Sequence, residues 1–298
     1  MLPHLTVALL MSSVLSTRAD EAPSATQGNT LLQRLLHEGV TLTDDVTVRL
    51  PEPEVPDGLE PEQRREIITR IAGRYGWRQF VRPSAVAPFV LRQAYIKDSQ
   101  QRRVGHALDL WFVAHGTLAD LQSQRTAEDL FGEGKSENGS PGNSMQELSA
   151  DILSCFGLGT VDPERERFVL VESSIMNRVY VRGIGHAQRS RTPESLLIAW
   201  ELDTRFNSDK ELAARWQPIE ATPLGERRRG NARLYQGVGG YAKITPLAEP
   251  EGAMLFEVHS VLHEPEDWFQ GSNFLRAKAP LIVREQVDKL RRKLALAK

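Results

Sequence analysis

The chain contains a single cysteine among its 298 residues. An intramolecular disulfide is therefore impossible, and the folded state has to be stabilised by its apolar core. The cysteine, Cys155, falls on the apolar stripe of a helix that we predict over residues 144–157. At such a position we expect a small core side chain rather than a reactive nucleophile.

Long apolar runs are missing as well. The apolar window at residues 5–15 is too short to span a bilayer core, which a helix crosses with roughly 20 residues. It has the length of the apolar region of a secretory signal, and Thr17 and Ala19 are small residues at the positions that precede a cleavage site. We therefore expect a signal peptide over residues 1–19 and a secreted or periplasmic mature protein. The alternative is a buried N-terminal helix.

Neither sign of charge dominates, because 37 Lys and Arg residues face 39 Asp and Glu residues. The formal net charge of −2 favours neither nucleic acid nor an anionic membrane as a partner. The sequence also lacks a Gly-x-Ser-x-Gly elbow, a His-Glu-x-x-His helix, a Cys-x-x-Cys pair and a dinucleotide fingerprint. We therefore predict no cofactor, no metal and no catalytic residue, although an active site can also assemble from scattered residues.

The start of the mature chain, residues 20–60, alternates short elements. A capping-box spacing that begins at Thr30 predicts a helix over residues 30–39. Alternating apolar residues over 46–50 predict a half-buried strand. Residues 51–56 contain three prolines, and proline donates no backbone hydrogen bond to a sheet. We expect this segment to be a stiff connector.

A helix and a hairpin are predicted next. Pro61 suits the first position of a helix that runs to about residue 75. Two β-prone runs, residues 89–96 and 104–115, flank a polar turn at 98–102, which is typical of a hairpin.

The middle of the chain is predicted to be helical around a loop. Residues 117–130 have a helix start signal, and a second capping box at Ser144 opens the predicted helix over 144–157. Between them, residues 132–143 contain four glycines and no apolar residue, so we expect a flexible surface loop.

The last third of the chain is rich in strands. One assignment is ambiguous, because residues 192–195 resemble a helix start while the alternation that follows favours a strand. Residues 205–229 form a polar excursion with one aromatic anchor, Trp216. The predicted strands are residues 167–172, 178–187, 195–203, 233–247 and 253–263.

The clearest element is a closing helix over residues 280–297. Pro280 suits its first turn, and its cationic face is expected to be solvated. One apolar stripe recurs at spacings of four and three residues, which is the signature of an amphipathic helix. The stripe consists of Val283, Val287, Leu290, Leu294 and Ala297.

These elements predict a single α+β domain over residues 20–298. Its curved antiparallel β-sheet is covered by a long C-terminal α-helix. This plan resembles the helix-grip arrangement of START-like lipid-binding domains, with no shared sequence motif, and the resemblance implies a fold rather than a function. A partly closed barrel is the alternative form of the sheet.

Two sequence features could indicate a binding site for phosphate or for a metal ion. The glycine cluster at residues 235–241 is followed by a β-like run, so a strand bend or the close approach of another backbone is favoured over a phosphate loop. His259 and His263 lie four apart on a predicted strand, about 13 Å from each other, which is too far for one metal. We expect them on a solvated or ligand-facing side of the sheet.

Several polar and aromatic residues could line a ligand pocket. Trp268 and Phe269, in the turn before the last helix, could form its mouth, but packing under the helix is favoured. The pocket candidates are Tyr180, Arg182, His186, Tyr235, Tyr241, Glu257, His259 and Trp268.

The leading hypothesis is an exported, non-enzymatic protein that binds an apolar or lipid-like small molecule between the sheet and the closing helix. One alternative is a hydrolase or cyclase-like enzyme with a cavity acid or base, for which His186, His259 and Glu257 are the candidates. The other is an envelope structural or interaction protein that uses exposed edge strands.

Overall fold

The computed structural model describes residues 28–122, 144–159, 161–221, 227–269 and 273–296. Its centre is an 11-stranded antiparallel sheet. In chain order the strands are β3 (Phe89–Lys97), β4 (Arg103–His115), β5 (Ser144–Glu147), β6 (Glu166–Ile175), β7 (Val179–Arg191), β8 (Leu196–Leu202), β9 (Arg215–Ala221), β10 (Arg227–Arg229), β11 (Arg233–Leu234), β12 (Val238–Pro246) and β13 (Ala253–His263).

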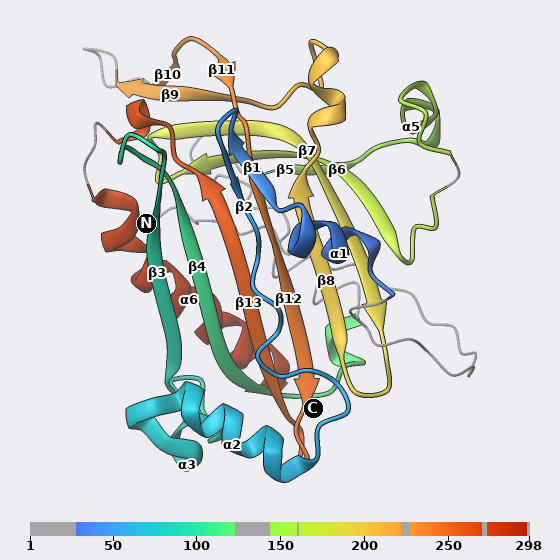
Figure 1. Cartoon of the computed structure of the whole chain (residues 1–298), viewed down its shortest axis with the longest axis vertical. Coiled ribbons are helices and arrows are strands. Elements are labelled where there is room, and N and C mark those ends of the chain that lie inside the picture. The colour runs from blue at the N-terminus through green and yellow to red at the C-terminus, as the bar shows by residue number, and fades with distance from the viewer. Residues whose placement is uncertain (1–27, 123–143, 160, 222–226, 270–272, 297–298) are drawn as a thin grey trace.

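The main path through this sheet is β5–β6–β7–β8–β12–β13–β4–β3. β9 pairs with the first part of β7, and β10 and β11 pair with β9. The sheet is curved but open, with β3 pairing only with β4 among the described residues (Figure 1). The predicted α+β class is confirmed, and the sheet is not closed into a barrel.

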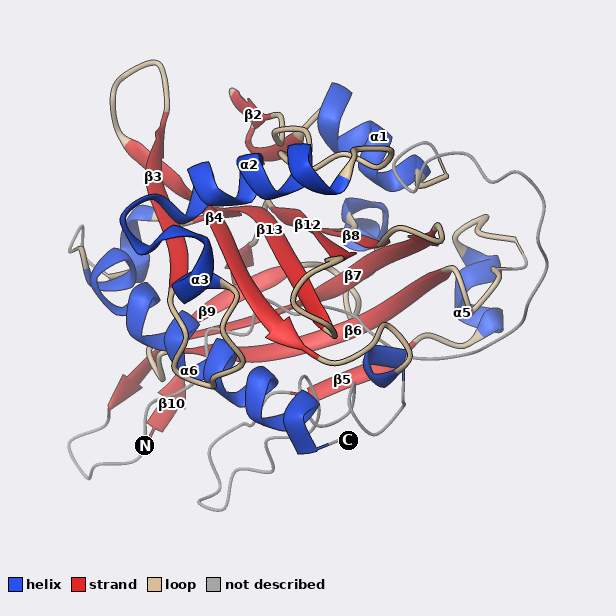
Figure 2. Cartoon of the chain, turned by 90° about the horizontal axis from the view of Figure 1, so that it is seen from below, coloured by secondary structure: helices blue, strands red, loops and turns tan. Residues whose placement is uncertain are grey.

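Helices and a small hairpin cover both faces of the sheet, so that the molecule has three layers (Figure 2). The C-terminal helix α6 lies on one face, while α1, the β1–β2 hairpin and α2 lie on the other. The bounds are α1 (Thr30–His37), β1 (Val40–Thr43), β2 (Val46–Val48), α2 (Pro61–Ala72), α3 (Gly76–Phe80), α5 (Ala150–Cys155) and α6 (Phe274–Leu296). Short 3-10 turns span Gly73–Tyr75, Asp120–Gln122, Thr204–Ser208 and Glu266–Trp268.

One face, which we call the α6 face, carries Phe112, Ile244 and Phe256. The rings of Phe112 and Phe256 stack with their centroids 4.7 Å apart. Val287 and Leu294 from the predicted helical stripe are buried against this cluster, and Val283 and Leu290 are partly buried against it. The amphipathic cover predicted for the sheet is therefore confirmed for these four stripe positions.

The opposite face, which we call the α1 face, carries Trp111, Leu197 and Tyr241. Leucines of α1 pack on Leu197 and Tyr241, and isoleucines of α2 pack around Trp111. Because side chains alternate along a strand, each long strand contributes to both cores. This explains why the central strands β12 and β13 are buried almost throughout.

Glycine permits one close approach in the predicted glycine cluster. A Cβ atom on Gly237 would lie 2.0 Å from the carbonyl oxygen of Thr41 in the β1–β2 hairpin. The hairpin therefore rests directly on the backbone before β12. The close approach of another backbone, which the sequence favoured over a phosphate loop, is confirmed at this position.

Most predicted elements agree with the structure, but the segment 144–157 does not. Ser144–Glu147 is strand β5, paired with β6, and α5 begins only after its N-cap residue Ser149. The pairing with β6 outweighs the local capping signal. Because α5 is short and buries only Leu153, Cys155 is exposed rather than part of the core.

Three further boundaries differ from the predicted ones. α6 begins at Phe274, so Pro280 lies inside the helix rather than in its first turn. Burial of Leu275 and Ala279 in the core continues the helix through the proline, which itself is exposed. Asn29 caps α1 in place of Thr30, because its side chain accepts the backbone N–H of Leu32. The segment 205–229, predicted as a polar excursion, contains strands β9 and β10. Its predicted aromatic anchor, Trp216, is buried.

Some predictions fall outside the described residues. These are the signal peptide at 1–19, the flexible loop at 132–143, the last stripe position Ala297 and most of the predicted helix at 117–130, of which the structure describes a short 3-10 turn. Within the described part of the chain, no helix combines the length and the apolarity needed to cross a membrane.

Candidate functional site

The structure separates the predicted pocket residues into groups. All six that lie on strands belong to the α1 face, away from α6, and the other two lie at the end of the sheet where α6 begins. The first group is Tyr180, Arg182, His186, Tyr241, Glu257 and His259, and the second is Tyr235 and Trp268. Their role as ligand contacts stays a prediction.

His259 is the centre of a buried polar network. Its Nδ1 lies 2.7 Å from a carboxylate oxygen of Asp109, and its Nε2 lies 3.0 Å from Glu257. Burial lowers the pKa of His259, but the hydrogen bonds to the two carboxylates outweigh it and raise the pKa to about 9. Both ring nitrogens are therefore engaged by protein groups, and the imidazolium is charged at neutral pH. His259 is buried, so of the two expectations for this side of the strand the solvated one is wrong, and a ligand-facing role stays a prediction.

The same network holds a segment of the chain that crosses the α1 face, residues 51–57, which we call the strap. Glu257 accepts the backbone N–H of Glu54 at 2.6 Å. The hydroxyl of Tyr241 donates to the carbonyl of Pro51 at 2.9 Å. Two predicted pocket residues thus bind the protein's own backbone.

Lys243 completes the attachment of the strap. Its Nζ donates to the carbonyl of Val55 at 2.7 Å and lies 2.7 Å from Asp57. The second oxygen of Asp57 accepts the hydroxyl of Ser195 at 3.0 Å. The proline-rich connector predicted from the sequence is therefore fixed at both ends by side chains of the sheet.

His186 has a comparable environment on β7. Its Nε2 lies 2.6 Å from Glu166, and its Nδ1 lies 3.7 Å from Glu201, which also pairs with Arg34 of α1. Burial lowers the pKa of His186, but the two carboxylates outweigh it and raise the pKa. The ring stacks on Phe168 with centroids 4.5 Å apart. These contacts attach α1 to the sheet and give no support to an acid–base role.

The remaining candidates on β7 lie near its first residues. The hydroxyl of Tyr180 donates to Glu172, which also lies 3.8 Å from Arg182. Burial and the bond to Glu172 raise the pKa of Tyr180 to about 12. The guanidinium of Arg229 covers the ring at 3.5 Å from its centroid. This tyrosine therefore stays neutral and enclosed.

Tyr235 and Trp268 stack on each other with ring centroids 5.4 Å apart. Both are buried in a cluster with Leu275 and Ala279 from the first turns of α6. Phe269 belongs to the same cluster. These aromatics pack under the helix, which is the interpretation that the sequence favoured.

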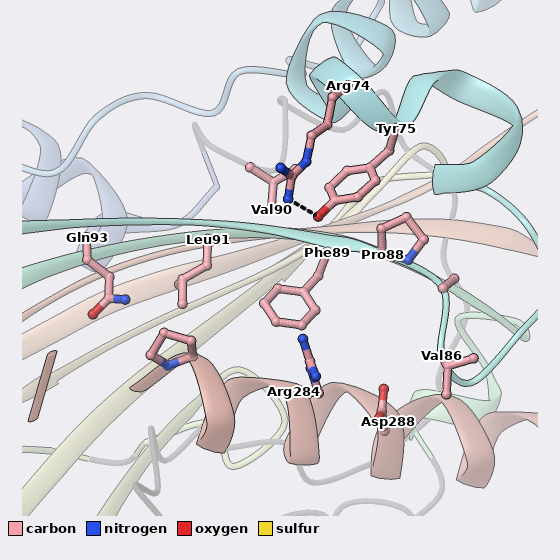
Figure 3. Close-up of a pocket in the computed structure, with 12 residues that line it drawn as sticks. Arg74, Tyr75, Val86, Pro88, Phe89, Val90, Leu91, Gln93, Arg284 and Asp288 are labelled. Atoms are coloured by element: carbon pink, nitrogen blue, oxygen red, sulfur yellow. Dashed lines mark hydrogen bonds between the residues drawn. The ribbon is translucent and has the colours of Figure 1, made fainter. Parts of the chain in front are cut away.

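A pocket with room for a ligand lies at the edge strand β3, beside α6. Its volume is about 600 Å³, within the range of 300–1,000 Å³ that is usual for small-molecule sites. Phe89, Leu91 and Gln93 line it on the side of α6, whereas Arg74, Tyr75 and Val90 line it on the other side of β3 (Figure 3). The lining residues are Arg74, Tyr75, Val86, Ala87, Pro88, Phe89, Val90, Leu91, Gln93, Pro280, Arg284 and Asp288.

The walls of this pocket combine apolar and polar groups. Phe89 and Leu91 are half-buried and supply apolar surface, to which Pro280 of α6 adds. Gln93 provides an amide, and α6 provides the guanidinium of Arg284 (Figure 3). Such a lining suits a molecule with an apolar body and a polar end.

A row of half-buried apolar residues continues from the pocket under α6. Leu91 is the register partner of Leu110 on β4, and Leu110 is the partner of Val258 on β13. Val258 is the only residue of β13 that is not buried. Helix α6 therefore leaves part of the apolar surface accessible at the centre of the sheet.

The far end of the pocket is fixed by Arg291 of α6. Its guanidinium donates to the carbonyls of Val113 at 2.8 Å and Pro88 at 3.0 Å, and also to that of Ala87. Burial lowers the pKa of Arg291 to about 10. The prediction that the cationic face of this helix is solvated is wrong for Arg291, because backbone carbonyls at the start of β3 and the end of β4 require its donors.

Sequence reasoning missed this pocket because it depends on two segments about 200 residues apart. The alternation of Phe89, Leu91 and Gln93 was visible, but not that β3 is an edge strand facing α6. Within the described residues no group of three or more His, Cys, Asp and Glu is placed to hold a metal ion.

Comparison with known proteins gives distant structural similarities, among them similarities to two solved structures. No protein-family model and no curated protein matches the chain. The lipid transfer and protein localization domain of human StarD13 matches with a TM-score of 0.41 and 8% identity, over 70% of this chain and 89% of that one. A putative uncharacterized protein from Rhizobium leguminosarum matches with a TM-score of 0.29 and 10% identity, over 70% and 98% of the two chains. We draw no functional conclusion from similarities at this level.

Proposed function

We propose that this protein binds an apolar or amphipathic small molecule, lipid-like in character, in the pocket at β3, beside α6. The observation that carries the proposal is the pocket of about 600 Å³ with its mixed lining. The half-buried row of Leu91, Leu110 and Val258 supports it, because it offers further apolar surface to a long ligand. Covering that surface would stabilise the complex by about 25 cal/mol for each Å² removed from water.

The lining also suggests how the ligand lies. Its apolar part contacts Phe89 and Leu91 and extends towards the centre of the sheet. Its polar end stays near Arg284, which is exposed at the mouth and can donate to a carboxylate, phosphate or hydroxyl oxygen. Asp288, one turn further along α6, limits how strongly negative that end can be.

We further propose that the protein acts outside the cytoplasm, supported by the signal-like residues 5–15. Expression of the full chain, followed by N-terminal sequencing of the product, tests this point. A mature protein that begins after Ala19 is expected. A product that stays in the cytoplasm and retains the first 19 residues would contradict it.

Ligand binding is tested on the full chain by native mass spectrometry and by titration with a fluorescent fatty acid. We expect co-purified lipid and saturable binding of the probe. Leu91→Trp narrows the pocket and should weaken probe binding at least about ten-fold, as expected for a misfit of a few methylene groups. Leu281→Trp is the matched control, because Leu281 is exposed on α6 and does not line the pocket.

The result that would overturn the proposal is equally specific. A protein that is always recovered empty, and whose unfolding temperature no lipid raises, does not bind such ligands. Equal weakening of probe binding by Leu91→Trp and Leu281→Trp would show that the probe binds elsewhere.

A further inference from the structure

The outer edge of β9 is lined by arginines. Residues 227–234 run antiparallel along β9, with Arg228 opposite Glu220 and Arg233 opposite Trp216. All three residues of β10 are exposed arginines, and both residues of β11 are exposed as well. We call Arg227, Arg228, Arg229, Arg233 and Leu234 the arginine edge.

Three carboxylates of the described residues partly offset this charge. Asp267 pairs with Arg233, and Glu220 lies opposite Arg228 in the register. Glu172 also lies near Arg229: burial raises the pKa of Glu172, but its hydrogen bonds and the charges of Arg182 and Arg229 outweigh burial and lower that pKa. In the described part of the chain, neither Arg227 nor Arg228 forms an ion pair. Among the described residues, the four arginines of the edge therefore exceed these three carboxylates by one positive charge, whereas the whole chain is close to neutral.

Aromatic rings beneath the edge hold two of the guanidinium groups at the surface. Arg229 lies 3.5 Å above the ring centroid of Tyr180, and Arg233 lies 5.2 Å from that of Trp216. Both rings are buried, so they cannot stack with nucleic-acid bases. A single-stranded nucleic acid, which needs such stacking platforms, is therefore not the favoured partner.

The apolar member of the edge points to another partner. Leu234 is 51% exposed, although it is a large aliphatic residue beside Arg233. Basic side chains together with an exposed aliphatic side chain are what a membrane surface attracts, since anionic head groups bind the former and the acyl boundary accepts the latter.

We propose that the arginine edge docks this protein on a membrane surface that carries anionic lipids. Each arginine near such a surface strengthens binding about five-fold, so the three residues of β10 together contribute on the order of 100-fold. Docking requires no ligand in the pocket beside β3, and its failure would leave the proposed ligand binding untouched. The competing explanation is that the arginines only prevent the edge from pairing with other sheets.

The experiment is flotation of the full chain with vesicles. One set contains phosphatidylcholine alone, and the other contains equal parts of phosphatidylcholine and phosphatidylglycerol. We expect binding to the second set only, and loss of that binding when the salt concentration is raised, because counterions screen the charges. The variant with Arg227→Gln, Arg228→Gln and Arg229→Gln should bind on the order of 100-fold more weakly.

A matched control removes the same charge elsewhere. Arg65, Arg70 and Arg78 are exposed on α2 and α3, at the other end of the molecule from β9 and β10 (Figure 1). The variant with all three replaced by Gln should bind vesicles as the parent protein does. Leu234→Ser should weaken binding, whereas Leu281→Ser on α6 should leave it unchanged.

Four results would overturn the proposal. The parent protein could fail to bind anionic vesicles, or the two triple variants could lose binding equally. The β10 variant could also keep its vesicle binding while it self-associates in sedimentation, which would assign the arginines to edge protection alone. Tighter binding of single-stranded RNA than of vesicles would instead favour nucleic acid. Circular dichroism confirms that each variant is folded.

Discussion

The Nζ atom of Lys243 lies 2.7 Å from a carboxylate oxygen of Asp57, and this ion pair fixes the strap to the middle of the sheet. The side chains are 1% and 12% exposed, so both charges are removed from bulk water. Buried ion pairs of this kind contribute little by their attraction alone, yet breaking one leaves an uncompensated charge. The pair is therefore a sensitive point of the fold.

Replacing Lys243 with methionine should destabilise the protein strongly. The charge of Asp57 loses its ion pair with Lys243, and the carbonyl of Val55 loses its donor. For this we expect a loss of about 3–5 kcal/mol in the free energy of unfolding. Urea denaturation followed by circular dichroism measures the loss. Adding Asp57→Asn should restore part of the stability, because it removes the charge that Lys243 no longer neutralises.

The control for this experiment is an exposed ion pair. Arg233 and Asp267 are both more than half exposed, so Arg233→Gln should change the free energy of unfolding by no more than about 1 kcal/mol. If Lys243→Met were as mild as this control, the strap would not depend on the buried pair.

The charge on His259 should make stability fall at alkaline pH. Its pKa is raised from an ordinary value near 6.5 to about 9, so the folded state binds the proton more tightly than the unfolded state does. The stabilisation is complete below pH 6.5 and is lost as the pH rises through about 9. Urea unfolding across this interval should show a loss on the order of 3 kcal/mol, which His259→Gln should largely remove.

His263, on the same strand, gives a contrast within one molecule. Burial lowers its pKa to about 4, so the unfolded state binds the proton more tightly than the folded state does. Its effect appears on the acidic side, as stability that is lost when the pH falls from about 6.5 towards 4. His263→Gln should flatten the acidic limb of the stability profile and leave the alkaline limb in place. The opposite pattern would show that the two environments are assigned wrongly.

The elements that sequence analysis located best are those whose periodicity is strong. The strand over 253–263 and the hairpin around residues 98–102 follow alternating patterns, and the structure places β13, β3 and β4 there. Segments 144–157 and 205–229 were misassigned because their strands are short, polar and stabilised by pairing with distant partners. Pairing with a distant strand produces no hydrophobic periodicity within the segment itself, so the sequence of that segment does not predict the strand.

The surroundings of His259 and the pocket beside β3 could not be predicted for the same reason, because both depend on contacts between segments that are distant in the sequence. Glu257 and His259 were recognised on one side of a strand, but the strap that covers them lies about 200 residues earlier in the chain. The sequence therefore indicated polar residues facing a ligand or solvent where the structure has a buried network. The pocket beside β3 likewise depends on which strand lies at the edge of the sheet.

Gly237 should not tolerate a side chain. A Cβ atom would lie 2.0 Å from the carbonyl oxygen of Thr41, which belongs to a backbone and cannot rotate away. Gly237→Ala must push the β1–β2 hairpin off the sheet, and we expect a loss of about 1–3 kcal/mol in the free energy of unfolding. Gly159→Ala is the control, because a Cβ atom there meets no neighbour within 4 Å. Thermal unfolding of the two variants gives the comparison, and equal midpoints would refute the close approach.

Arg291 should decide how firmly α6 closes on the sheet. Arg291→Met keeps the aliphatic stem but removes every donor, which leaves the carbonyls of Val113, Ala87 and Pro88 without their partner. Unsatisfied buried acceptors cost about 1–3 kcal/mol each, so the helix should detach more often. Hydrogen exchange should therefore become faster in α6 than in α1, and the affinity for a fluorescent fatty acid should fall with it. Arg292→Met, an exposed neighbour on the same helix, should leave both measurements unchanged. If exchange in α6 and α1 accelerated equally, Arg291 would stabilise the whole domain rather than the closure of the helix over the pocket.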